Sequence, residues 1–162
     1  MAAFTLFHVV LSLIGIATGF VIIAGMLTSN RMNGVTAIFL TFTTLTSATG
    51  FLLPVHHFMP SHAIGILSLI VLAFAIYARY PRHLAGSWRW IYVATAIIAQ
   101  YFNTFVGIVQ AFQKIPFLHS LAPTQSEPPF AITQGVVLLL FIVVGIVSAK
   151  KFHPQPNVPM AT

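Results

Sequence analysis

The side chains best suited to chemistry in this 162-residue sequence are its seven histidines. Three of them, His56, His57 and His62, lie close together around a segment bounded by Pro54 and Pro60. Neutral imidazoles bind zinc, copper, nickel or haem iron without help from a thiolate or a carboxylate. An imidazole also changes its charge near neutral pH. The cluster therefore favours a metal or haem site, with a pH-sensitive or proton-conducting role as a second hypothesis.

His8 adds a histidine near the start of the first apolar run of the chain. It shares one helix face with Gly15 and Gly19, since spacings of seven and four residues return to the same side of a helix. The two glycines let another helix approach closely, and they leave room for a flat porphyrin. A haem b with two histidine ligands needs one histidine on each of two facing helices at similar depth. We therefore predict a haem b that His8 and His62, or His8 and His57, hold between two helices.

A copper or zinc site is an alternative that the histidines leave open. It would use the histidines at one side of the predicted bundle, His56, His57, His62 and His119. His119 belongs to the long connection before the last apolar run, and connections of that length are often functional. The same connection contains Glu127, the sole acidic residue, and is long enough to fold over the histidines. The remaining explanation is that the histidines are interfacial residues without a ligand.

A stripe of polar positions follows the fourth apolar run. Its members recur every three or four residues and so share one helix face: Gln100, Asn103, Gly107, Gln110 and Lys114. Thr43 and Ser47 form a second polar seam on the second run. Because burying an unpaired amide costs roughly 2 to 7 kcal/mol, these side chains must meet each other, water or a ligand. We predict a polar pocket formed by Gln100, Asn103, Gln110, Thr43 and Ser47, with hydrogen bonds between helices as the alternative.

The composition indicates which class of protein carries these residues. Hydrophobic residues make up 58% of the chain and charged residues only 5%, with a mean hydropathy of +0.96. A soluble domain has about a quarter of its residues charged, so we predict an integral membrane protein. The chain has no cysteine, no Asp and one Glu, which excludes thiolate chemistry, iron–sulfur clusters, paired-carboxylate hydrolases and Ser-His-Asp triads. Ligand binding is therefore favoured over catalysis.

The apolar residues gather in runs of the length that a membrane requires, which is about 20 residues of helix. Five runs of about this length are bounded by charged, proline or turn residues, over about 4–27, 35–55, 62–77, 90–112 and 131–149. We predict an all-α bundle of five transmembrane helices in a single domain, 1–151, followed by a short proline-rich cytoplasmic tail, 152–162. The first run is too long for the apolar core of a signal peptide, so we expect it to stay uncleaved.

Positive charge predicts the orientation of these spans, because Lys and Arg accumulate in cytoplasmic loops. With the N-terminus outside and the C-terminus in the cytoplasm, six of the seven Lys and Arg residues lie on the cytoplasmic side, and only Lys114 lies outside. The histidine cluster then faces outward. The net charge of +6 is spread over three cytoplasmic segments, which does not resemble a nucleic-acid surface. We expect the protein in a bacterial cytoplasmic (inner) membrane.

These observations lead to three functional hypotheses. The first is a small membrane protein that binds haem b or a transition metal, Cu or Zn, for electron transfer or metal handling. The second is a non-catalytic accessory subunit that packs through Gly15 and Gly19 against a membrane protein partner, or a homo-oligomer. The third is a small-solute or proton pathway along Gln100, Asn103 and Gln110.

Overall fold

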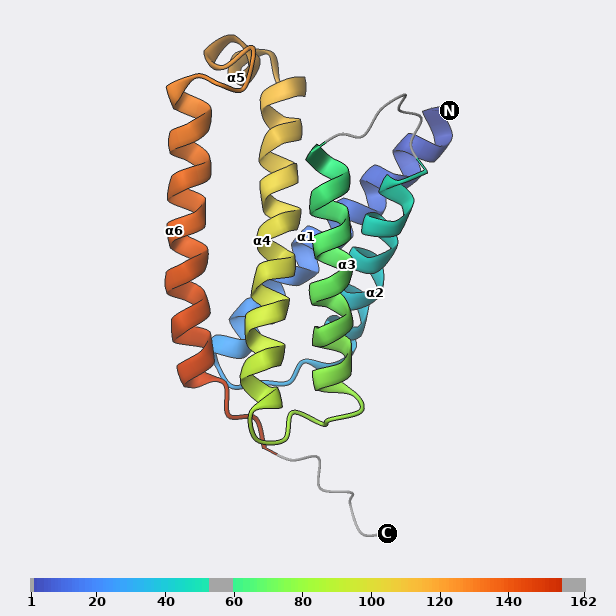
Figure 1. Cartoon of the computed structure of the whole chain (residues 1–162), viewed down its shortest axis with the longest axis vertical. Coiled ribbons are helices and arrows are strands. Elements are labelled where there is room, and N and C mark those ends of the chain that lie inside the picture. Colours follow the sequence, from blue (N-terminus) through green and yellow to red (C-terminus); the bar gives the residue numbers. More distant parts are fainter. Residues whose placement is uncertain (1, 53–59, 156–162) are drawn as a thin grey trace.

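The chain folds into a bundle of helices (Figure 1). The structure is a computed structural model and describes residues 2–52 and 60–155. Within these two ranges there is no strand, and the helices are α1 (Ala2–Leu27), α2 (Asn33–Gly50), α3 (Pro60–Arg79), α4 (Trp88–Lys114), α5 (Pro116–Leu121) and α6 (Pro128–Lys151). The prediction of an all-α chain is therefore confirmed.

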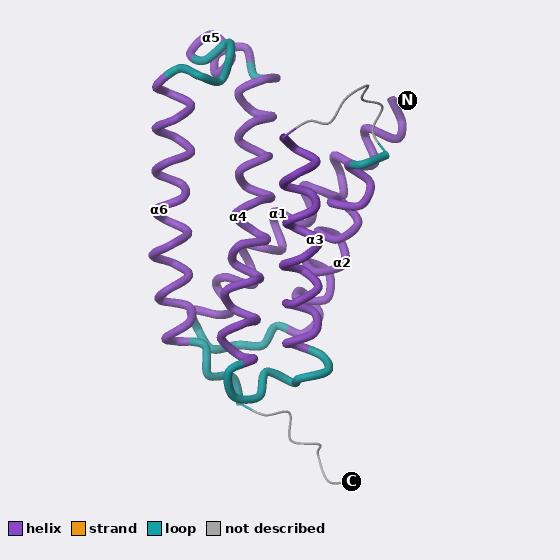
Figure 2. Tube along the Cα trace, viewed as in Figure 1, coloured by secondary structure: helices purple, strands orange, loops and turns teal. Residues whose placement is uncertain are grey.

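The longer helices run between the two ends of the bundle, and the connections lie at those ends (Figure 2). α1 begins near the end that carries α5, and α6 finishes at the opposite end (Figure 1). We call the first the α5 end. The second is the basic end, because six of the seven cations lie there, on the α1–α2 and α3–α4 connections and at the ends of α3, α4 and α6: Arg31, Arg79, Arg82, Arg89, Lys150 and Lys151.

Among the described residues, four helices are long and apolar enough to cross a membrane: Ala3–Leu27, His62–Arg79, Trp88–Lys114 and Pro128–Lys151. They correspond to the first, third, fourth and fifth predicted spans, and they are the helices expected of an integral membrane protein. α2 has 18 residues, or about 27 Å of helix, but its many threonines make it less apolar. It ends at Gly50 rather than at 55 as predicted, and residues 53–55 lie outside the described ranges.

The close-packed core occupies the half of the bundle nearer the basic end. Its buried side chains come from the end of α1, the start of α2, the end of α3 and the start of α4, and they include Ile22, Met26, Phe39, Leu72 and Tyr92. Phe152, just after α6, is also buried, and its ring centroid lies 5.9 Å from that of Tyr92. Toward the α5 end, the same four helices separate around a cavity.

The connection between α4 and α6 is compact and contains a helix that periodicity did not predict, because α5 has only six residues. The Glu127 carboxylate accepts hydrogen bonds from the N–H and hydroxyl of Thr124 at 3.2 and 2.9 Å and from the N–H of Ser126 at 3.1 Å. Gln125 Nε2 donates to the Val109 carbonyl of α4 at 3.0 Å. The connection is thus fixed above α4 and α6 (Figure 1).

Candidate functional site

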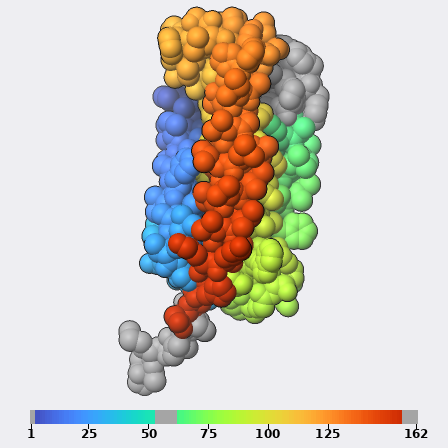
Figure 3. Space-filling view, turned by 90° about the vertical axis from the view of Figure 1, so that its left-hand side faces the viewer, coloured from blue at the N-terminus to red at the C-terminus, as the bar shows by residue number. Residues whose placement is uncertain are grey.

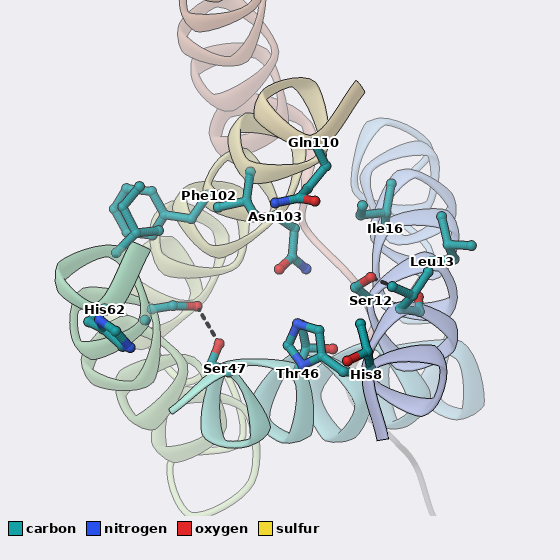
Figure 4. Close-up of a pocket in the computed structure, with 18 of the residues that line it drawn as sticks. His8, Ser12, Leu13, Ile16, Thr46, Ser47, His62, Phe102, Asn103 and Gln110 are labelled. Atoms are coloured by element: carbon teal, nitrogen blue, oxygen red, sulfur yellow. Dashed lines mark hydrogen bonds between the residues drawn. The ribbon is translucent and has the colours of Figure 1, made fainter. Parts of the chain in front are cut away.

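A cavity of about 470 Å³ lies between α1, α2, α3 and α4 in the α5 half of the bundle. These helices contact one another in the order α1, α2, α3, α4 and back to α1. α1 and α3 therefore face each other across the cavity, as the view into it shows (Figure 4). Any pair of side chains from α1 and α3 that points inward can reach a ligand from opposite sides.

His8 projects into this cavity from the second turn of α1 (Figure 4). Its Nδ1 lies 2.9 Å from the Thr49 hydroxyl oxygen. The Thr49 hydroxyl donates its own proton to the Leu45 carbonyl at 2.7 Å, so its oxygen accepts the proton of His8 Nδ1–H. The neutral ring then has an unprotonated Nε2. Metal-bound histidines have this arrangement, with one ring N–H held by a hydrogen bond and the other nitrogen free to bind the metal.

His62 lies on the first turn of α3, on the opposite side of the cavity from His8 (Figure 4). Its ring stacks on the ring of Phe51, with the centroids 5.6 Å apart and the planes at 27°. Phe51 lies close against α3 at Gly65, where a Cβ would come within 3.1 Å of the phenyl ring. Because Gly65 has no side chain, the Phe51 ring has room to lie against α3 and to stack on His62.

Hydroxyl and amide groups line the rest of the cavity. Asn103 Nδ2 donates to the Thr43 hydroxyl oxygen at 3.1 Å, and the Ser47 hydroxyl donates to that of Ser68 at 3.1 Å. Asn103, Ser47 and Gln110 belong to the predicted polar pocket and all line the cavity, whereas Thr43 is fully buried beneath it. Gln110 is exposed nearer the α5 end of α4. The polar lining therefore extends from the hydrogen bond between Asn103 and Thr43, deep in the bundle, to the surface at Gln110.

The predicted helix-packing glycines lie below the cavity and face helices of the same chain. A Cβ at Gly19 would overlap the side-chain amide of Gln100, whose Nε2 donates to the Ile16 carbonyl at 2.9 Å. A Cβ at Gly15 would lie 3.1 Å from the Thr43 hydroxyl oxygen. Gln100 is fully buried and does not line the cavity. It thus connects α4 to α1, which is the structural role that the sequence left open for this stripe.

The histidines proposed for a copper or zinc site are not brought together in the part of the chain that is described. Within it, no group of three or more His, Cys, Asp or Glu side chains could hold a metal ion. His119 is exposed on α5 and does not line the cavity. His56 and His57 lie outside the described residues. His8 and His62 are therefore the histidines that the structure places on one cavity.

The charge of the cavity lining is neutral to positive. Lys114 lines it from the last turn of α4, and no acidic side chain does so among the described residues. The sole carboxylate, Glu127, is engaged in its own loop. The cavity is thus suited to a ligand that is mostly apolar, that accepts nitrogen ligands, and that carries negative charge near the mouth.

Several contributors to the site were not predicted. Thr49 and Phe51 orient the two histidines, and Ser68 and Phe102 complete the lining. Their residue types are common in apolar helices, and only the relative depth and rotation of neighbouring helices brings them to the histidines.

Comparison with known proteins gives no further guidance, since the chain matches no protein family, no curated protein and no solved structure.

Proposed function

We propose that the protein binds haem b in the cavity between α1, α2, α3 and α4, where His8 and His62 would hold it, and that it serves electron transfer. The contact of His8 Nδ1 with the Thr49 hydroxyl oxygen at 2.9 Å supports the proposal, because a ring that donates from Nδ1–H there has Nε2 left for a metal. His62 stands on the opposite wall of the same cavity.

The size and lining of the cavity support a flat, largely apolar cofactor. Its volume of about 470 Å³ falls within the range of roughly 300–1,000 Å³ that is usual for cofactor and ligand sites. Ile16, Phe102 and Val106 supply apolar walls. Gln110 and Lys114, both exposed at the last turns of α4, are placed to bind the carboxylates of the haem propionates.

The distribution of charge supports the orientation of the bundle. If α2 crosses the membrane as a fifth span, the positive charge favours an α5 end outside and a basic end in the cytoplasm. A haem in the α5 half would then exchange electrons with a partner at the outer surface. We place the protein in a bacterial cytoplasmic membrane, where such an arrangement connects membrane and outer-side electron carriers.

A solute or proton pathway through the bundle has less support. Below the cavity, Gln100 and Thr43 are fully buried, and Phe39 and Leu72 of the core follow them toward the basic end. A cavity that ends on a packed core is suited to holding a ligand rather than to passing one.

The proposal is tested by the absorption spectrum and the metal content of the detergent-purified protein. Wild-type protein is expected to contain iron and to show a Soret band that shifts on reduction with dithionite. His8→Ala and His62→Ala are expected to lose most of the bound haem. His119→Ala is the matched control, because this histidine is exposed on α5 and does not line the cavity.

Folded wild-type protein that stays colourless and takes up no added haem would rule out haem binding. Bound copper or zinc in such a preparation would assign the histidines to a colourless metal site instead.

A further inference from the structure

A second hollow lies on the outer surface of the bundle, in the half nearer the basic end. It has a volume of about 700 Å³ and is formed by α4 and α6. Its floor and walls are apolar, and Ile98, Ile142 and Ile146 are all exposed on it. α6 stands at the surface along its whole length (Figure 3). The α4–α6 groove therefore opens toward the surroundings of the bundle and not toward its interior.

Two cationic side chains stand at one end of the α4–α6 groove. Arg89 and Lys150 line it there, together with His153. Arg89 Nη1 donates to the Phe152 and Ala149 carbonyls at 2.6 and 3.2 Å, which fixes the guanidinium beside the end of α6. A guanidinium has five N–H donors, so others remain for a ligand. Lys150 is exposed, and its ammonium group is available at the same place.

Among the described residues, no acidic side chain lies near these cations. The sole acid of the chain, Glu127, precedes the first residue of α6, and it is separated from Lys150 by nearly the whole length of that helix, about 35 Å. No acidic side chain of residues 2–52 and 60–155 therefore offsets the positive charge at this end of the groove.

We propose that the α4–α6 groove binds one anionic phospholipid, with its phosphate at Arg89 and Lys150 and an acyl chain along the two helices. The apolar part extends from Trp90 to Tyr101, which is about 16 Å along α4 and suits most of an acyl chain. Trp90 is 48% exposed at the cationic end, the depth at which indole rings accumulate beside head groups. Juxtamembrane cations favour anionic lipids in the cytoplasmic leaflet.

A second copy of the chain fits this groove poorly. Copies in one membrane share one orientation, so a neighbour would bring its own basic end against Arg89 and Lys150. Like charges placed together across an interface oppose association. An anionic lipid complements the groove in both respects. Its phosphate is opposite in charge to Arg89 and Lys150, and its acyl chain is apolar like the groove walls.

The test is native mass spectrometry of the full-length, delipidated protein with an equimolar mixture of phosphatidylglycerol and phosphatidylcholine. We expect one phosphatidylglycerol to bind preferentially. Lys150→Gln should weaken that binding roughly fivefold, the effect of removing one lysine near a membrane surface. Lys151→Gln is the matched control, because Lys151 is the next residue and does not line the groove.

A second pair of variants tests the position of the acyl chain. A Cβ at Gly145 would lie 3.3 Å from Ile97, whereas nothing lies within 4 Å of one at Gly135 on the same helix. Gly145 lines the groove and Gly135 does not. A leucine at 145 fills space that the acyl chain would use, so Gly145→Leu should reduce lipid occupancy and Gly135→Leu should not. Both variants should remain helical by circular dichroism.

Equal binding of the two lipids, or equal effects of Lys150→Gln and Lys151→Gln, would overturn the proposal. So would a dimer that persists when phosphatidylglycerol is added, or binding of inorganic phosphate with the same sensitivity to Lys150→Gln. Each of these results would assign the groove to another occupant. None of them bears on haem binding, because the two cavities share no residue.

Discussion

The orientation of His8 depends on one hydroxyl group of the neighbouring helix. The Thr49 hydroxyl donates to the Leu45 carbonyl at 2.7 Å, so its oxygen is the acceptor for His8 Nδ1, 2.9 Å away. Without this acceptor, the imidazole can rotate and exchange tautomers, and Nε2 is no longer fixed toward the cavity. Hydrogen-bond partners of this kind commonly contribute about 10- to 100-fold to metal affinity.

Thr49→Val therefore serves as a test of the hydrogen bond at nearly constant side-chain volume. We expect haem affinity to fall by about tenfold or more, measured by titration of the purified apoprotein with haem. Thr95→Val is the control, because the Thr95 hydroxyl donates only within its own helix, to the Ile91 carbonyl at 2.6 Å. Equal affinities of the two variants would show that Thr49 does not orient a ligand.

Sequence spacing could predict the inward direction of His8, but not its partner. Spacings of three or four residues fix a helix face whatever the neighbours do, and Asn103 and Gln110 of one such face both line the cavity. The contact between His8 and Thr49 joins residues 41 positions apart. It depends on the tilt and the relative shift of α1 and α2, which a single sequence does not encode in any local pattern.

At the scale of elements, the close approach of α1 and α4 depends on a missing side chain. The Gln100 amide occupies the space that a Cβ at Gly19 would take, and its Nε2 bonds to the Ile16 carbonyl at 2.9 Å. Gly19→Ala should force the two helices apart or break that bond. We expect a loss of about 1–3 kcal/mol in the free energy of unfolding, as for other overpacked sites.

The measurement is denaturant-induced unfolding in detergent, followed by circular dichroism. Gly34→Ala is the control, since nothing lies within 4 Å of a Cβ there, and it should be neutral or slightly stabilising. Adding Gln100→Ala to Gly19→Ala should recover part of the lost stability, because it removes the side-chain amide that the new methyl group would overlap. If Gly19→Ala is as stable as Gly34→Ala, the described packing of α1 on α4 is wrong.

The long apolar helices were predictable because length and hydropathy are local properties. Four predicted spans coincide with helices that are long and apolar enough to cross a membrane. The helices whose bounds differ from the prediction are those with weak local signals. α2 mixes threonines, such as the buried Thr36 and Thr43, with apolar residues. Its hydropathy therefore does not mark where the helix ends. α5 is only six residues long, which is too short for a periodic pattern.

At the scale of the whole molecule, charge separates the two ends of the bundle. Six cations lie at the basic end, and the cavity with Lys114 lies toward the other. This asymmetry predicts that the α5 end is outside the cell. The chain has no native cysteine, so single cysteines can report the side of the membrane directly.

We expect Ser126→Cys to react with a membrane-impermeant maleimide in intact cells. Ala85→Cys should react only after the membrane is permeabilised. Both residues are exposed, one beside α6 at the α5 end and the other between α3 and α4 at the basic end. Labelling of both cysteines in intact cells, or the reverse pattern, would contradict the proposed orientation of the bundle.

His8 and His62 are proposed to bind one haem from opposite walls of the cavity. The most direct measurement is the spin and coordination state of the haem-loaded protein, read from its absorption spectrum with and without added imidazole. The wild type should be six-coordinate and low-spin. The haem that His8→Ala and His62→Ala still bind when haem is added in excess should be five-coordinate and high-spin, and imidazole should return it to the low-spin state. A wild type that binds no haem, or single variants that stay low-spin without imidazole, would contradict the assignment of His8 and His62 as haem ligands.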